Sequence, residues 1–148
     1  MKVLSEPSSS RPTVAPSALP SRLELPAGIV GFPDHKQADL FAVTEQLPFR
    51  WLRLLGPETV HFVVIEPGGL VPDYVPELFD EDAEVLGLES PDDALVLNIV
   101  TVGRTEPVTA TVNLVGPLII NRRTGVARQV VLSNHNRYSA RQPLVTAS

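Results

Sequence analysis

The sequence predicts a mostly β protein, a compact antiparallel β-barrel-like or sandwich single domain with one or two short helical turns. The chain has 148 residues, which is the usual length of one domain. Its 15 Pro are spread along the whole chain, and this disfavours long helices. Seven short runs rich in β-branched or aromatic residues are each about as long as a strand, and turn residues bound most of them.

Residues 1–22 are predicted to form a flexible N-terminal arm, because Pro and Ser recur there with little apolar surface to bury. We expect this arm to add nothing to the core, and residues 23–148 to form the domain. No apolar stretch follows Lys2, so a secretory signal is not supported. The absence of Cys and of any membrane-spanning apolar run favours a cytoplasmic protein with no membrane partner.

The predicted strands follow one another along the domain. In order, they cover residues 40–43, 49–55, 60–65, 95–102, 109–115, 118–121 and 126–132. Polar and apolar residues alternate in residues 109–115, with Ala110, Val112 and Leu114 on one face. This alternation predicts a half-buried strand.

The run at residues 95–100 differs because it is apolar on both faces except at Asn98. Such a run is typical of a central strand that is covered on both sides. Residues 122–125 are predicted to form a hairpin turn, in which Gly125 supplies a positive φ.

Helix is predicted at residues 80–86, with Asp80 as the N-cap, acids in the first turn and Gly87 as the C-terminal stop. A helical turn is expected next, where Ser90 can cap and Asp93 matches a capping-box partner.

The net charge of −5 conceals a segregation of charge along the chain. Residues 54–103, called here the acidic segment, contain eleven acids and no Lys or Arg, whereas residues 104–148 contain six Arg and the single acid Glu106. An unpaired acidic surface attracts basic partners and repels nucleic acid. The alternative is a solvated face that the Arg-rich end neutralises in the fold, and the sequence leaves both open.

The sequence lacks the motifs of several catalytic and binding classes. It contains no G-x-S-x-G, no Gly-rich phosphate loop and no His pair at metal-ligand spacing, so we expect no enzyme, no metal and no cofactor. His61 lies in a predicted strand and is expected to be satisfied or outward-facing. A pI near 5.1, and Arg residues without interleaved aromatics, disfavour direct nucleic-acid binding.

Two aromatic residues are candidate interface anchors. Trp51 is in a strand-like run, where burial in the core is the favoured interpretation. Tyr74 lies between two Pro in a segment that suggests an exposed, stiff edge, and core and interface remain equally open for it.

Several short motifs, taken together in their order and spacing, resemble the FliW family of bacterial flagellar assembly factors. They extend from about Leu25 to Leu144. The motifs are Pro26-Ala27-Gly28-Ile29-Val30-Gly31-Phe32, Pro48-Phe49-Arg50-Trp51-Leu52, Phe62-Val63-Val64-Ile65-Glu66-Pro67, Pro72-Asp73-Tyr74, Leu86-Gly87-Leu88-Glu89-Ser90-Pro91-Asp92-Asp93, Val112-Asn113-Leu114, Pro117-Leu118-Ile119-Ile120-Asn121 and Gln129-Val130-Val131-Leu132. The Pro/Ser-rich start departs from the family's usual opening strand pair, so the first strand is expected to be missing or altered.

The resemblance implies a β-barrel-like domain without enzymatic activity, a monomer when free, that has two protein partners. These are the RNA-binding translational regulator CsrA, which FliW-like proteins antagonise, and flagellin. An alternative is a chaperone-like module that only shields a terminal helix of flagellin. For the partner surface we predict Glu66, Asp73, Tyr74, Glu77, Asp80 and Asp82.

Overall fold

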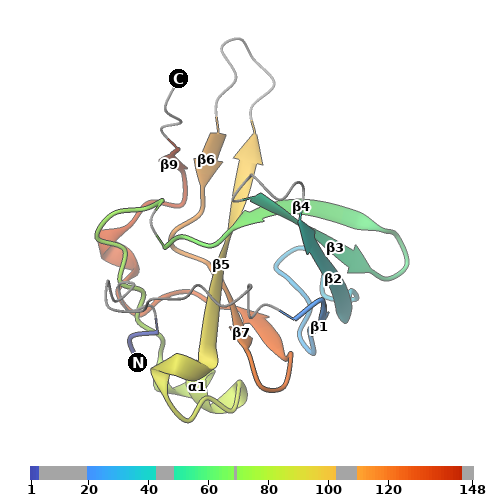
Figure 1. Cartoon of the computed structure of the whole chain (residues 1–148), viewed down its shortest axis with the longest axis horizontal. Coiled ribbons are helices and arrows are strands. Elements are labelled where there is room, and N and C mark those ends of the chain that lie inside the picture. Colours follow the sequence, from blue (N-terminus) through green and yellow to red (C-terminus); the bar gives the residue numbers. More distant parts are fainter. Residues whose placement is uncertain (4–19, 43–48, 69, 103–109, 145–148) are drawn as a thin grey trace, which may run out of the picture.

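The computed structural model describes residues 1–3, 20–42, 49–68, 70–102 and 110–144. Antiparallel strands form one curled sheet with few short helices, which confirms the predicted mostly β fold (Figure 1). The strands are β1 (Arg22–Glu24), β2 (Gln37–Ala42), β3 (Phe49–Leu55), β4 (Val60–Ile65), β5 (Ala94–Val102), β6 (Ala110–Val112), β7 (Leu118–Asn121), β8 (Ala127–Gln129) and β9 (Gln142–Pro143). The helices are α1 (Asp80–Val85) and the 3-10 turns η1 (Pro91–Asp93) and η2 (His135–Arg137).

Strand β5 lies at the centre of the sheet and pairs with three others. Its first half pairs with β7, and its second half pairs with β4 on one edge and β6 on the other. The sheet curls until β1 reaches the β7–β8 hairpin. There Glu24 forms a parallel bridge with Val126 and donates its N–H to the carbonyl of Gly125 at 2.9 Å. Gly125 has a φ of 78°, as the hairpin turn requires.

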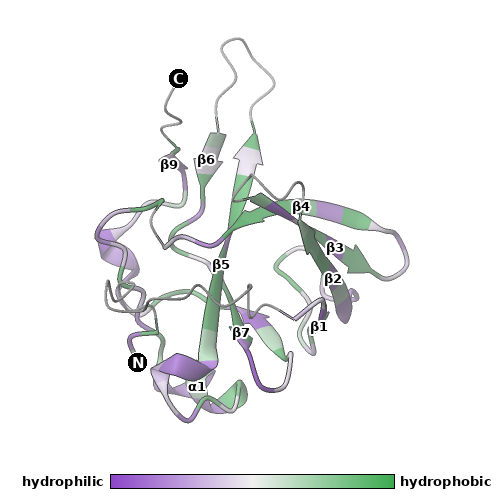
Figure 2. Ribbon diagram, viewed as in Figure 1, coloured by the Kyte–Doolittle hydropathy of each residue, from purple (hydrophilic) through white to green (hydrophobic). Residues whose placement is uncertain are grey.

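Each face of β5 packs against a separate hydrophobic core, as predicted for a strand covered on both sides. The inner core lies within the curl and includes Leu97 of β5 together with Leu52 and Leu118. The outer core includes Val96 and Val100 on the opposite face of β5. Figure 2 shows hydrophobic residues along much of β5 and hydrophilic ones on α1. Because β5 belongs to both cores, it joins the two halves of the domain.

A buried hydrogen-bond network crosses the outer core. Asn98 of β5 is fully buried, and its Nδ2 donates to the Tyr74 hydroxyl at 3.1 Å and to the Asn113 carbonyl at 2.9 Å. The Tyr74 hydroxyl donates to the carbonyl of Leu114 at 2.7 Å. Burial raises the pKa of Tyr74. The network therefore ties the segment before α1 to the central strand.

The expectation that the arm adds nothing to the core is wrong at its start. Val3 is 4% exposed and belongs to the outer core. Residues 1–3 run antiparallel to residues 76–78, where Leu78 donates its N–H to the Met1 carbonyl at 2.8 Å. Residues 4–19, which make up most of the predicted arm, lie outside the described residues, and the domain boundary at residue 23 stays a prediction.

Helix α1 ends as predicted but starts differently. The N-cap is Phe79, with extended backbone, rather than Asp80, which instead lies in the first turn with two other acids. Carboxylates there still interact favourably with the helix dipole. At the other end Gly87 has a φ of 69°, and Leu88 donates its N–H to the Ala83 carbonyl at 3.0 Å, which is a Schellman ending.

The turn η1 is held by Asp93, as the predicted capping box requires. The Asp93 carboxylate accepts the N–H of Glu89 at 2.9 Å and of Ser90 at 3.2 Å, and Arg123 Nε lies 3.2 Å from its other oxygen. The hydrogen bond from Glu89, then that from Ser90 and the charge of Arg123, hold the pKa of Asp93 below its usual value.

Two strands were not predicted from the sequence, and two are shorter than expected. Strand β8 covers only Ala127–Gln129 of the predicted residues 126–132, and β2 begins at Gln37 rather than at residue 40. Strands β1 and β9 have three and two residues, which is too short for an alternating pattern. Strand β6 ends at Val112 because the Asn113 side chain accepts the N–H groups of Val115 and Gly116 and turns the chain.

Trp51 lies in neither core, which corrects the favoured interpretation. Strand β3 alternates, so that Leu52 and Leu54 face the inner core while Trp51 and Arg53 lie on the opposite face, half-buried. On the same face Phe49 and Val63 pack against the outer core, but this packing does not include Trp51. The sequence motif around Trp51 does not reveal which face of the strand is buried.

This alternation predicts unequal effects of two neighbouring substitutions. Leu52→Ala should lower the free energy of unfolding by about 2–5 kcal/mol, because it leaves a cavity in the inner core. Trp51→Ala should cost nearer to about 1 kcal/mol. Urea denaturation followed by circular dichroism measures both. Equal losses, or a loss at Trp51 of about 3–5 kcal/mol, would place Trp51 in a core.

The lowered pKa of Asp93 predicts a pH dependence. A carboxylate whose pKa is lower in the folded state than in the unfolded state stabilises the fold when it is ionised. This stabilisation is complete above the pKa of the unfolded state, about 3.9 for Asp, and it is lost as the pH falls through the pKa of the folded state. Asp93→Asn should therefore lower the melting temperature at pH 7, and its difference from the parent should shrink as the pH falls below about 4. Asp92→Asn is the matched control, since Asp92 is exposed and has no ion pair among the described residues. If the difference in melting temperature between Asp93→Asn and the parent does not change with pH, the charge of Asp93 does not stabilise the fold as described.

Candidate functional site

The acidic segment does not form one continuous unpaired surface. Glu66 Oε2 lies 3.0 Å from Nη1 of Arg50, and Asp82 Oδ1 lies 3.1 Å from Nε of Arg128. The Asp82 side chain is only 17% exposed. The charges of these two predicted contact residues are thus balanced within the chain.

Three further acids of the segment lie near cations. Glu77 is 3.8 Å from Lys2, and Arg123 lies 3.2 Å from Asp93 and 3.8 Å from Glu89. Two of the cations that pair with the segment, Arg123 and Arg128, come from the Arg-rich end. The interpretation in which that end neutralises the acids therefore holds for part of the segment.

The other six acids of the segment are exposed and form no ion pair with a described residue. They are Glu58, Asp73, Asp80, Glu81, Glu84 and Asp92. Four of these lie on α1 or η1 and are called here the α1 acidic surface: Asp80, Glu81, Glu84 and Asp92. The segment's unbalanced charge is thus concentrated at one end of the molecule.

Contacts on the opposite side of α1 hold this surface toward solvent. Ala83 is buried, and Leu86 belongs to the outer core. The side chain of Asn121, at the end of β7, is itself buried and donates to the Leu86 carbonyl at 2.8 Å. The Asp82–Arg128 pair links the helix to β8. These contacts fix the rotation of α1 and leave Asp80, Glu81 and Glu84 exposed.

Two exposed apolar residues flank the acids of α1. Phe79 precedes the helix and Val85 ends it, and both side chains are about half or more exposed. A surface that combines carboxylates with exposed apolar side chains suits a basic protein surface with an apolar component.

The structure separates the residues that the sequence predicted for the partner surface. Asp80 and Asp82 share α1, whereas Glu66 directly follows β4 and forms an ion pair with Arg50. Asp73 is exposed in the loop before α1, with a φ of 60°. The partner-binding role of these acids stays a prediction.

Tyr74 requires a correction, because it is not an exposed edge residue. Its side chain is 4% exposed, packs edge to face on Tyr138 with ring centroids 4.8 Å apart, and hydrogen-bonds within the outer core. The flanking Pro residues suggest an exposed edge segment, but the Tyr74 side chain is buried, and its hydroxyl accepts a hydrogen bond from the buried side chain of Asn98.

Sequence reasoning missed Glu81, Glu84 and Asp92 as surface residues. A signal for the first two exists in the predicted helix, where the apolar residues Ala83 and Leu86 are three positions apart and mark one side as buried, although the apolar Val85 is exposed. Residues on the other side of the helical wheel must then face solvent. No comparable pattern identifies Asp92.

Neither a metal site nor a membrane helix is found in the residues described. No group of three or more His, Asp or Glu there is arranged to hold a metal ion. None of the described helices is long and apolar enough to cross a membrane.

Comparison with known proteins gives a consistent result. The sequence model described as FliW protein matches residues 8–144. The chain is 31% identical over 123 residues to the flagellar assembly factor FliW of Leptospira biflexa, covering 83% of this chain and 80% of that protein. It is 34% identical over 122 residues to that of Natranaerobius thermophilus, covering 82% and 80%.

The fold agrees with the sequence comparison. A crystal structure of the flagellar assembly factor FliW superposes with a TM-score of 0.73 at 30% sequence identity, and the match covers 85% of this chain and 86% of that one. The curled sheet, the family match over most of the chain and the relatives at about one third identity lead to one conclusion. The chain belongs to the FliW family of flagellar assembly factors.

Proposed function

We propose that this flagellar assembly factor binds CsrA, an RNA-binding translational regulator, through the α1 acidic surface and so relieves repression of flagellin translation. We also propose that it binds flagellin, and that it acts in the cytoplasm, as a monomer when free, by binding rather than by catalysis. The observation that carries the regulator proposal is the cluster of exposed acids on α1 and η1 without an ion pair among the described residues.

Electrostatics supports this choice of partner. A protein that binds RNA must present Lys and Arg to phosphates, and its affinity for RNA depends strongly on those charges. Carboxylates held outward by a fixed helix complement such a surface and oppose RNA next to it. Exposed Phe79 and Val85 add apolar contacts that a purely charged surface would lack.

A second candidate function is a chaperone-like module that shields a terminal helix of flagellin without antagonising the regulator. The exposed side chains of Phe79 and Val85 favour it, because an amphipathic helix binds through its apolar face. In that case the acids would serve solubility only. Ionic strength separates the two functions, since salt screens exposed charge pairs but affects apolar contacts much less.

The test is a double charge reversal on α1 with a matched control. Glu81→Lys with Glu84→Lys should slow association with CsrA about tenfold or more at low salt, because complementary charge acts mainly on the association rate. The effect should shrink as salt rises. Surface-binding kinetics at two ionic strengths measure it, with circular dichroism to check folding.

The control carries the same change in net charge elsewhere. Asp34 and Glu58 are exposed and form no ion pair with a described residue, so Asp34→Lys with Glu58→Lys changes the total charge equally. This variant should associate much faster than the α1 variant. If the two double variants associate with CsrA at the same rate, the α1 acidic surface is a solvated face that does not bind the regulator. If, in addition, both double variants still bind flagellin, the chaperone-like function is favoured.

A further inference from the structure

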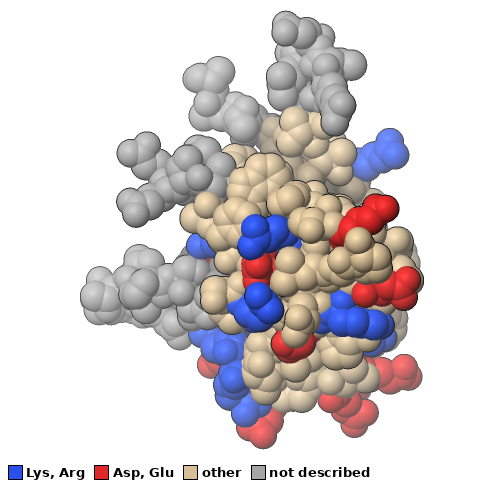
Figure 3. All heavy atoms as spheres, turned by 90° about the vertical axis from the view of Figure 1, so that its right-hand side faces the viewer, with Lys and Arg blue, Asp and Glu red and all other residues tan. Residues whose placement is uncertain are grey.

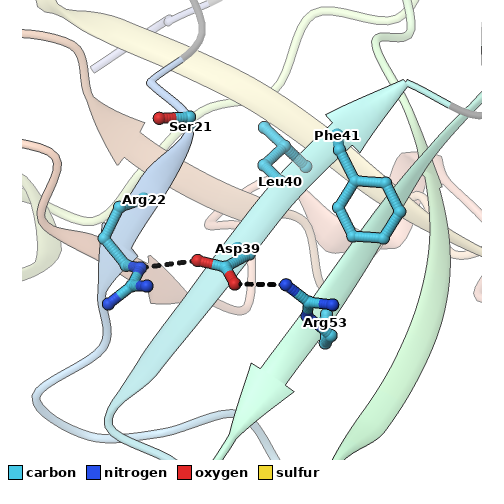
Figure 4. Close-up of a pocket in the computed structure, with 6 residues that line it drawn as sticks. All are labelled: Ser21, Arg22, Asp39, Leu40, Phe41 and Arg53. Carbon is cyan, nitrogen blue, oxygen red and sulfur yellow. Dashed lines mark hydrogen bonds and ion pairs between the residues drawn. The ribbon is translucent and has the colours of Figure 1, made fainter.

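The outer face of β1–β3 carries an open pocket away from α1. Its volume is about 490 Å³, and it is lined by Ser21, Arg22, Asp39, Leu40, Phe41 and Arg53 (Figure 4). In the strand register Asp39 of β2 lies between Arg22 of β1 and Arg53 of β3. Figure 3 faces this side of the molecule, where basic and acidic side chains alternate among a larger area of uncharged residues.

One carboxylate orients two guanidinium groups in this pocket. Arg22 Nε donates to Asp39 Oδ1 at 2.6 Å, and Arg53 Nη2 donates to Asp39 Oδ2 at 2.7 Å. Hydrogen bonds from Arg53 and then Arg22 hold the pKa of Asp39 below its usual value, so it is ionised at neutral pH. The lining residues therefore carry a net charge of one positive unit.

Most of the hydrogen-bonding capacity of these guanidiniums is unused by Asp39. Each guanidinium has five N–H donors, and Asp39 takes one from each. Nε of Arg53 is buried without an acceptor among the described residues and is out of reach of a ligand, whereas the Arg53 side chain as a whole is 40% exposed and can offer its other N–H groups. The two Arg side chains are thus held in place with donors left for a further acceptor.

An aromatic surface borders the charged pocket. The Arg53 guanidinium carbon lies 5.3 Å from the centroid of the exposed Phe41 ring. Trp51 is opposite Phe41 in the register of β2 and β3, and it packs edge to face on the exposed His61 with ring centroids 6.0 Å apart. None of these aromatic side chains belongs to a core.

We propose that this pocket binds a Glu or Asp side chain carried by an apolar segment of a protein partner. The planar fork of Arg matches the two oxygens of a carboxylate, and Arg with aromatic residues is typical of the energetic centres of interfaces. Phe41 and Trp51 offer contact area for aliphatic side chains next to that carboxylate. Asp39 limits the pocket to one net positive charge, which favours a single carboxylate over a phosphate chain.

This inference does not rest on the proposed function. Figure 1 shows α1 and the β1–β3 edge at separate places on the molecule. The two surfaces also have opposite charge preferences. Charge reversal at Glu81 and Glu84 should leave binding at the pocket unchanged.

Trp51 makes the proposal directly measurable, because it is the only Trp in the chain. The probe is a synthetic amphipathic peptide of Leu and Glu with helical periodicity, compared with a peptide in which Gln replaces every Glu. The Glu peptide should change Trp51 fluorescence with a saturable titration. The Gln peptide should bind about tenfold more weakly, since it lacks a charge-assisted pair.

Variants of the two guanidiniums locate the site. Arg53→Gln and, separately, Arg22→Gln should each weaken binding of the Glu peptide about tenfold. Arg128→Gln is the matched control and should bind like the parent. Arg128 also pairs with an Asp, and its side chain is 38% exposed against 40% for Arg53. Because Arg22 lies on an edge strand and is half exposed, its variant tests the proposal even if Arg53→Gln unfolds.

Several results would overturn the proposal. Equal binding of the Glu and Gln peptides, or no binding of either, would show that the pocket does not recognise carboxylates on an apolar segment. Displacement of the peptide by inorganic phosphate at similar concentration would indicate a general anion site. Tighter binding of a single-stranded oligonucleotide than of the Glu peptide would assign the face to nucleic acid instead.

Discussion

Strand β5 packs against both cores, and the position of the α1 acidic surface follows from that burial. A strand between two cores cannot expose a polar side chain to water, so Asn98 must find its partners inside the protein. It donates to the Tyr74 hydroxyl and to the Asn113 carbonyl. Tyr74 in turn brings the segment before α1 onto the outer core, and Leu78 and Leu86 continue that packing on either side of the helix. The direction in which the acids of α1 point is therefore set by contacts that begin at the central strand.

The distribution of charge follows from the same packing. Where the acidic segment crosses other strands, Arg50 and Arg128 balance Glu66 and Asp82, whereas the solvent side of α1 meets no described cation. At the β1–β3 edge a single Asp39 orients two Arg next to exposed aromatic rings. A chain with a net charge of −5 thus presents one surface suited to basic partners and another suited to a carboxylate. For a small assembly factor, two such surfaces would allow two partners to be bound independently.

Much of the fold was predictable because it depends on local patterns. Strands β3, β4 and β7 match the predicted ranges at both ends, and Gly87 and Gly125 end the helix and form the hairpin turn as expected. The errors concern contacts between elements that are far apart in the sequence. The pattern around Trp51 identifies the strand but not its covered face, and so it wrongly favours a core position for Trp51. For Tyr74 the local sequence does not decide between core and interface, because its partner Asn98 is 24 residues away. Ion pairs such as Asp82–Arg128, 46 residues apart, decide which acids remain unbalanced, and spacing along the chain does not reveal them.

Native-state hydrogen exchange of the β5 amides tests most directly whether one strand joins both halves of the domain. If it does, the slowest amides of β3 in the inner core and those of β7, together with β5 itself, should exchange at the same free energy, that of global unfolding. A urea series resolved by residue measures this, because subglobal openings separate from global unfolding at low denaturant. Inner-core amides that exchange through a separate opening, at clearly lower free energy than those around Asn98, would contradict the account.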